Sequence, residues 1–352
     1  MSKKRQFDGG TLFCGANSAD GFVSFFDDML RGVDRVYIMK GGPGTGKSSL
    51  LRQAAEHAHE MGRSVEYFAC SSDPDSLDGI VVDGSIAIVD GTAPHICEPR
   101  LAGAKDEIID LGRFWDSQAL FSRRGEIESL ADKKSKYYRL AYRYLDAAKR
   151  VRDIDLSLVM PFVNTAKAER AVTRLFSDVK TGGGAERSVG MIDSYGMKGR
   201  VRLDTYEFCA ERVYAVEELY GTATLFLRLM LTRAAHTDTP VVVSFDPIDC
   251  ESPTALFFPN DKKAFVISIR DSEIDADVRI NMRRFLDMRG LSGIRREYKQ
   301  NLKLYDALVS SALDSLASAG EAHFELEGIY SSCMDFSAKE EYCTSFLKKI
   351  FG

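Results

Sequence analysis

The chain has 352 residues, and its 47 basic and 52 acidic side chains leave a formal net charge of −5. Hydrophobic residues make up 45% and charged residues 28%, which excludes a disordered chain and is typical of a globular protein. The small negative charge excludes a protein that is basic over its whole surface, and the length predicts two or more domains.

The sequence also indicates where the protein works. No stretch approaches the about 18 consecutive apolar residues of a membrane span, and no apolar segment follows the basic N-terminal residues as in a secretory signal. The seven cysteines are odd in number and form no Cys-x-x-Cys pair, which is typical of free thiols in a reducing compartment. We therefore expect a cytoplasmic protein without a membrane partner.

The most specific motif is residues 41–48 (GGPGTGKS), which match the phosphate-loop pattern G-x-x-x-x-G-K-[ST]. Residues 35–40 predict a buried strand before it and residues 49–58 a helix after it, the context that the pattern requires. Glycines let backbone N–H groups face phosphates, and the helix N-terminus adds partial positive charge. Lys47 is expected to contact the β- and γ-phosphates, and the Ser48 hydroxyl to bind Mg²⁺. The predicted nucleotide-binding residues are Gly41, Gly42, Pro43, Gly44, Thr45, Gly46, Lys47, Ser48 and Ser49.

An acidic loop follows the next predicted strand. Residues 64–70 predict a strand, and residues 71–79 (SSDPDSLDG) follow at its carboxyl end, where α/β folds place ligands. Asp73 is a candidate for positioning a water molecule or a substrate hydroxyl. Asp-Pro and Asp-Gly are also turn dipeptides, so a purely structural turn stays open.

A third predicted strand ends in an acid. Residues 85–90 (SIAIVD) resemble a Walker B strand, with Asp90 expected to hold Mg²⁺ through water. His95 follows soon after and is a candidate for sensing the γ-phosphate or orienting water, with an ordinary loop role equally open.

Residues 117–180 lack strand signals and predict a helical hairpin. Apolar residues recur at spacings of three, four and seven, with gaps at Arg123 and Lys134, and Pro161 separates a second helix. Basic side chains concentrate in residues 133–152. Nucleic acid is one possible partner for them, but a solvated helix face is the favoured interpretation. An arginine from this region or the loop before it is a candidate for contacting phosphates, and the sequence does not select among Arg100, Arg113 and Arg123.

The second half repeats the first. Residues 35–37 (RVY) recur at 212–214, and several other short matches recur in the same order at nearly constant shifts, including Asp73-Pro74 with Asp246-Pro247. We therefore predict a tandem duplication of units of about 176 residues, with the glycines at 182–184 as the linker. The predicted domains are 1–180 (core about 10–116, helical hairpin 117–180) and 181–352 (core about 190–270, helical segment 271–352).

The phosphate-binding residues are lost in the second copy. Opposite Lys47 and Ser48 stand Thr224 and Leu225, and Glu218 with its neighbour Glu217 adds negative charge where phosphates would lie. Residues 263–268, opposite the strand of Asp90, end without an acid. We expect this half to be a scaffold, a regulator or a surface for a protein partner.

Residues 41–48, 71–79 and 89–95 (VDGTAPH) together resemble a family of bacterial tandem P-loop ATPases. The resemblance covers most of the chain and implies a mostly parallel α/β sheet of the P-loop NTPase type, duplicated in tandem. It also implies ATP binding with hydrolysis. In that family the second copy can carry a phosphate loop too, and this chain departs from the pattern at residues 223–225.

The sequence therefore predicts a Mg²⁺-dependent ATPase with one working site, where Lys47 stabilises phosphate charge and Asp73 or His95 positions water. One alternative is a metabolite kinase that holds its acceptor with residues 73–78. The other is a nucleotide-dependent switch with little turnover. The expected ligands are ATP or ADP with Mg²⁺, and the two halves could pack as an intramolecular pseudo-dimer.

Overall fold

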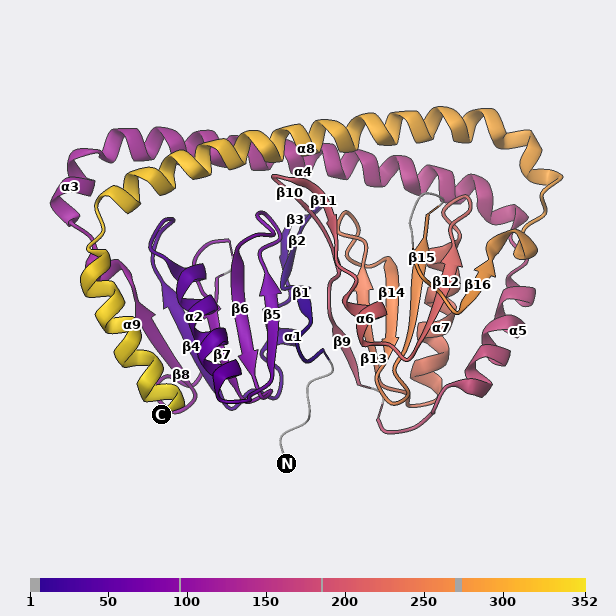
Figure 1. Cartoon of the computed structure of the whole chain (residues 1–352). Helices are drawn as coiled ribbons and strands as arrows, with labels where there is room; N and C mark the ends of the chain where they lie inside the picture. The colour runs from indigo at the N-terminus through magenta and orange to yellow at the C-terminus, as the bar shows by residue number, and fades with distance from the viewer. Residues whose placement is uncertain (1–6, 95, 185, 270–273) are drawn as a thin grey trace.

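The computed structural model describes residues 7–94, 96–184, 186–269 and 274–352. Two α/β halves stand next to each other beneath a pair of long antiparallel helices, α4 and α8 (Figure 1). Among the helices in those ranges, none has the length and apolar character needed to cross a membrane.

The first half is built on a six-stranded sheet. Its strands in spatial order are β1 (Thr11–Phe13), β5 (Val65–Ala69), β6 (Leu77–Val82), β7 (Ile86–Asp90), β4 (Arg35–Lys40) and β8 (Asp106–Asp110). Only β6 runs antiparallel to its neighbours in this sheet. Helix α2 (Lys47–Glu60) buries Leu50, Leu51 and Ala54 against one face, because these apolar residues recur on one side of the helix.

The second half repeats this arrangement. Its strands in spatial order are β9 (Arg187–Val189), β13 (Val241–Phe245), β14 (Pro253–Phe258), β15 (Lys263–Ser268), β12 (Arg212–Glu217) and β16 (Val278–Asn281). Strand β14 is antiparallel, as β6 is in the first sheet, and α7 (Ala223–His236) corresponds to α2. The predicted α/β fold with two mostly parallel sheets is confirmed, and the shared element order agrees with a duplication.

Backbone hydrogen bonds correct one predicted correspondence between the copies. The amide of Cys70 donates to the carbonyl of Ser76, and the amide of Asp246 donates in the same way to Ser252. Asp246 therefore corresponds to Cys70. By the same hydrogen-bond pattern Asp73 corresponds to Asp249 rather than to Asp246. The match of the two Asp-Pro pairs was wrong by three residues, so it gives no argument about the role of Asp73.

Each half reaches into the other through a small hairpin. One hairpin is formed by β2 (Gly15–Ser18) and β3 (Gly21–Ser24), and its counterpart by β10 (Asp193–Gly196) and β11 (Gly199–Arg202). The amide of Met197 donates to Ser72 at 2.9 Å, and the amide of Ala19 donates to Ile248 at 3.0 Å. Short helices α1 (Phe26–Met29) and α6 (Thr205–Cys209) follow the hairpins.

The helices that follow each core also cross between the halves. After α3 (Ser117–Ser122), α4 (Arg124–Val159) has 36 residues and a length of about 54 Å, enough to pass over both sheets. Helix α5 (Thr165–Leu175) then packs against α7 of the second half, with Ala168 and Val172 in the same core cluster as Phe226.

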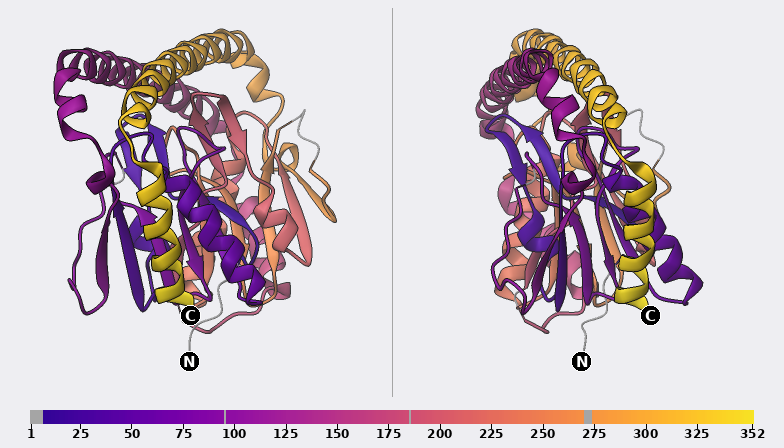
Figure 2. Two further views of the ribbon diagram at one scale, coloured as in Figure 1. Left: turned by 60° about the vertical axis from the view of Figure 1, so that its left-hand side comes forward. Right: turned by 90° about the vertical axis from the view of Figure 1, so that its left-hand side faces the viewer.

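The last two helices of the second half likewise pack against the first half. Helix α8 (Arg295–Ser332) runs back beside α4, and α9 (Phe336–Phe351) packs against α2 of the first half, where Figure 2 shows it beside that helix. Cys343 and Phe346 of α9 join the core cluster of Leu50. The predicted helical hairpins are therefore corrected: α4 pairs with α8 rather than with α5, and each terminal helix covers the sheet of the other half.

Candidate functional site

The candidate site is the loop of residues 41–46, between the carboxyl end of β4 and the N-terminus of α2. Gly44 and Gly46 have φ angles of +71° and +77°, which favour glycine, and Gly46 is the N-cap of α2. No side chain caps α2, so its first backbone N–H groups keep their capacity to bind an anion. The backbone therefore explains why glycine stands at these positions.

Lys47 and Asp90 lie together at this edge of the sheet. Asp90 ends β7, pairs with Met39 of the neighbouring β4, and places Oδ2 3.6 Å from Lys47 Nζ. Lys47 also donates to the carbonyls of Gly41 and Gly42 at 3.0 and 2.7 Å. Burial raises the pKa of Asp90 although the Lys47 charge opposes this, because desolvation disfavours the charged carboxylate.

The hydroxyl groups of the loop have defined partners. Ser48 Oγ accepts the backbone N–H of Leu77 at 3.0 Å, which fixes the hydroxyl and leaves an oxygen lone pair for a metal ion. The Thr45 hydroxyl is buried and donates to the carbonyl of Gly42 at 3.0 Å, so it stabilises the loop from within. Pro43 is half-buried and Ser49 is exposed in the first turn of α2.

The remaining predicted residues have different surroundings. Asp73 forms an ion pair with Lys198 of the β10–β11 hairpin at 2.8 Å, and Asp75 pairs with the same lysine. Asp78 is buried in β6 and accepts the Cys14 thiol at 3.7 Å. His95 lies outside the described residues. The structure thus brings together Lys47, Ser48 and Asp90, and gives Asp73 a partner from the second half.

Helix α8 of the second half covers the loop, which the sequence did not reveal. Ser331 Oγ donates to the carbonyl of Gly44 at 3.2 Å. A Cβ atom placed on Gly44 would lie 2.4 Å from Ser331 Oγ and 2.7 Å from the carbonyl oxygen of Glu327. The rings of Trp115 and Tyr330 lie 5.3 Å apart beside Gly42. The loop is therefore closed on one side by Trp115 of its own half and by residues of α8, of which Ser331 is 287 positions along the chain from Gly44.

Two lysines and a neutral histidine interact at the same place. Burial lowers the pKa of Lys134 on α4, and the charge of Lys47 lowers it further. Burial also lowers the pKa of His323 on α8 to about 4, with the charges of Lys134 and Lys47 acting in the same direction. A bound anion would relieve this repulsion. The gap that Lys134 makes in the apolar seam of α4 is the sequence signal for this residue.

The corresponding loop of the second half is filled by its own carboxylate. Glu218 stands where the first half has Gly41, and it accepts the backbone N–H groups of Gly221 at 2.6 Å and Ala223 at 3.3 Å. Burial raises the pKa of Glu218, because these hydrogen bonds only partly replace water. The donors that would bind a phosphate are thus occupied from within the chain.

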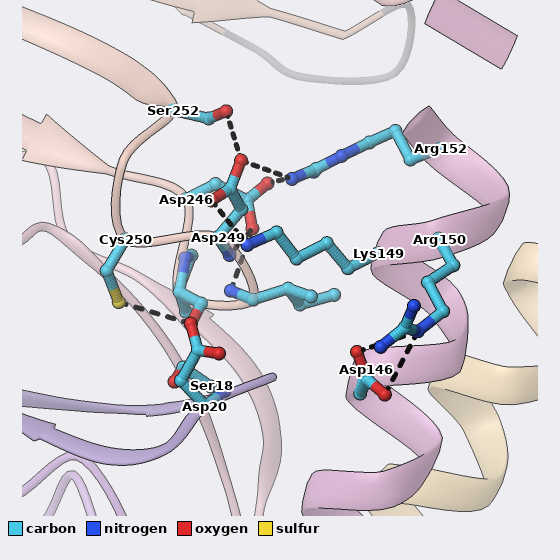
Figure 3. Close-up of polar contacts among 12 residues, drawn as sticks. Ser18, Asp20, Asp146, Lys149, Arg150, Arg152, Asp246, Asp249, Cys250 and Ser252 are labelled. Atoms are coloured by element: carbon cyan, nitrogen blue, oxygen red, sulfur yellow. Dashed lines mark hydrogen bonds and ion pairs between the residues drawn. The ribbon is translucent and has the colours of Figure 1, made fainter. Parts of the chain in front are cut away.

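Arg152 and Lys149 of α4 form a charged cluster with Asp246 and Asp249 (Figure 3), and the charge of Arg152 opposes the rise in the pKa of Glu218. Isolated β-bridges join Trp115 to Met334 and Val163 to Leu286. The two bridges are equivalent when Trp115 corresponds to Leu286 and Val163 to Met334, which is an offset of 171 residues between the copies. At this offset Arg152 of α4 is the counterpart of His323 of α8. Arg152 pairs with Asp246 at 2.5 Å, as Figure 3 shows.

Lys149 pairs with Asp249 at 3.2 Å in the same cluster. On the other long helix, Glu325 pairs with Lys133 at 3.5 Å. Several basic residues of α4 therefore serve internal ion pairs, which favours a structural role for them over nucleic-acid binding.

Comparison of the chain with models of protein families finds no match. Comparisons with curated proteins and with solved structures find none either. The resemblance to tandem P-loop ATPases stays a prediction, and the functional argument depends on the geometry and charge of the site.

Proposed function

We propose that the protein binds ATP with Mg²⁺ at residues 41–48 and hydrolyses it there. A glycine loop at an uncapped helix N-terminus, with Lys47 beside it 3.6 Å from Asp90, is the main support. A polyphosphate supplies the negative charge that such a group of side chains and N–H dipoles favours.

Each residue has a proposed role in this reaction. Lys47 would exchange the carbonyls of Gly41 and Gly42 for phosphate oxygens, and Ser48 with Asp90 would hold Mg²⁺. Bound Mg²⁺ would neutralise charge that develops on the β- and γ-phosphate oxygens. Water adds to the γ-phosphorus as the bond to the β–γ bridging oxygen breaks, which releases ADP, phosphate and one proton. Asp73 is the described candidate for positioning that water.

The second half is proposed to bind no nucleotide. Glu218 occupies the loop donors. Ala223 begins α7 as Lys47 begins α2, so Ala223 and Thr224 are opposite Lys47 and Ser48, and the predicted match with Thr224 and Leu225 was wrong by one residue. Thr224 keeps a hydroxyl, but Ala223 provides no ammonium group for phosphates. Its proposed role is structural and regulatory, because α8 and the β10–β11 hairpin contact the nucleotide loop and the Asp73 loop of the first half.

A nucleotide-dependent switch with little turnover is the second candidate. The hydrogen bond from Ser331 to Gly44 joins the loop directly to the other half, so a ligand at the loop would alter a contact between the halves. No observation among the described residues favours the kinase alternative, and Lys198, which pairs with Asp73 and Asp75, would compete with an acceptor hydroxyl as it would with a positioned water.

Phosphate release by the purified full chain with Mg²⁺-ATP separates these functions. Release without any added acceptor supports hydrolysis, and release only after a metabolite mixture is added supports a kinase. Tight ATP binding without release supports the switch. Lys47→Ala should abolish ATP binding to the whole chain, and ATP affinity of the wild-type strength in this variant would refute the single-site proposal.

A further inference from the structure

Lys339 lies at the nucleotide loop although it belongs to α9 of the second half. It is 3% exposed, and its Nζ would lie 3.2 Å from a Cβ atom placed on Gly46. The ammonium group donates to Glu340 Oε2 at 3.4 Å, which is long for a hydrogen bond between two charged groups.

This position is unfavourable for a cation on its own. A buried ammonium loses its hydration, and a long bond to Glu340 replaces little of it. The N-terminus of α2, which begins beside Gly46, carries partial positive charge and repels the lysine further. An anion between the helix N-terminus and the ammonium would reverse both effects.

The second half provides an internal comparison. At the offset of 171 the counterpart of Lys339 is Ala168 of α5, and the counterpart of Ser331 is Met160. Both line an apolar cavity of about 160 Å³ together with Leu225 in the first turn of α7. The half that has lost its phosphate residues has therefore also lost the lysine on the helix that covers the loop.

We propose that Lys339 contacts the phosphate groups bound at residues 41–48, so that the second half completes the site of the first. This inference depends on the proposed function. Helix α9 is held in place by the Gln53 to Glu340 hydrogen bond of 2.7 Å and by the burial of Cys343 and Phe346 in the core of the first half.

The arginines that the sequence offered for this role are engaged elsewhere. Arg113 lies over the rings of Phe114 and Tyr342, as its guanidinium carbon is 5.6 and 5.7 Å from their centroids. The other two form ion pairs on the surface, Arg123 with Glu126 and Arg100 with Asp27.

The test compares Lys339→Met with Lys349→Met in the full chain. Lys349 is the matched control, because it is on the same helix and also contacts the first half, but is 60% exposed and pairs with Glu107. Lys339→Met should lower kcat at saturating Mg²⁺-ATP by roughly 100-fold and weaken tripolyphosphate binding by roughly tenfold. Lys349→Met should stay within about twofold of wild type in both measurements.

Two further measurements separate phosphate contact from packing. Lys339→Arg should recover a large part of the rate, and a merely structural lysine would gain nothing from arginine over methionine or glutamine. Without nucleotide, Lys339→Met should unfold at the same temperature as wild type or higher, because it removes a poorly paired buried charge. If the methionine variant fails to fold, Lys339→Gln takes its place.

The outcomes distinguish the two proposals. If wild type binds tripolyphosphate and ATP but Lys339→Met behaves as Lys349→Met does, the role of Lys339 is refuted and the proposed function stands. If wild type binds neither compound, both proposals are refuted.

Discussion

Gly44→Ala should disrupt the contact between the loop of residues 41–46 and α8. The residue has φ +71°, and an alanine in this region costs about 1 kcal/mol. Its methyl group would lie 2.4 Å from Ser331 Oγ and 2.7 Å from the Glu327 carbonyl oxygen. The hydroxyl can rotate away but the backbone carbonyl cannot, so overpacking adds about 1–3 kcal/mol. The expected loss in the free energy of unfolding is about 2–4 kcal/mol.

Gly62→Ala is the matched control for this variant. Gly62 has φ +69° and nothing within 4 Å of an added Cβ, so only the backbone cost of about 1 kcal/mol applies. Urea denaturation measures both variants, and amide hydrogen exchange should show faster exchange at the C-terminal end of α8 in Gly44→Ala alone. Equal destabilisation by the two variants, with unchanged exchange in α8, would refute the close contact between loop and helix.

Two other predictions concern the ionised groups around the loops. Arg152→Met should lower the free energy of unfolding, measured by urea denaturation, by about 3 kcal/mol, because it leaves the partly buried Asp246 without its cation. The control Arg150→Met removes an exposed ion pair and should change the free energy of unfolding by less than about 0.5 kcal/mol. The pKa of His323 is lowered to about 4 in the folded protein, so unfolded chains bind more protons and stability should fall as the pH drops from about 6.5 toward 4. His323→Gln should flatten this part of the stability–pH curve, and an unchanged slope would contradict the assigned environment.

The local parts of the site could be predicted from sequence, and the distant parts could not. The loop of residues 41–48 and the position of Asp90 were predicted from two short motifs, each made of a strand and the residues directly after it. The geometry of such a motif depends on residues that are neighbours in the sequence. The amphipathic pattern of α9 indicates that one face is buried, but it does not say against which sheet, so Lys339 and Ser331 gave no signal.

The correspondence of the two copies was harder to read for another reason. The offset between them changes along the chain, and it reaches 171 in the long helices. A two-residue match such as Asp-Pro cannot detect an offset that varies by a few residues. Backbone hydrogen bonds fix the correspondence, because they depend on chain geometry rather than on side-chain identity.

The exchanged helices have a consequence for how such a chain could have evolved. Two identical copies that traded their last helices would form a symmetric dimer, with each copy closing the other's loop. Once fused, the copies could change independently. The residues of the second loop could then change while α8 and α9 remained under selection, because these helices close the loop of the first half. The first could lose polar residues from α5 without cost, since the loop beneath that helix is already filled by Glu218.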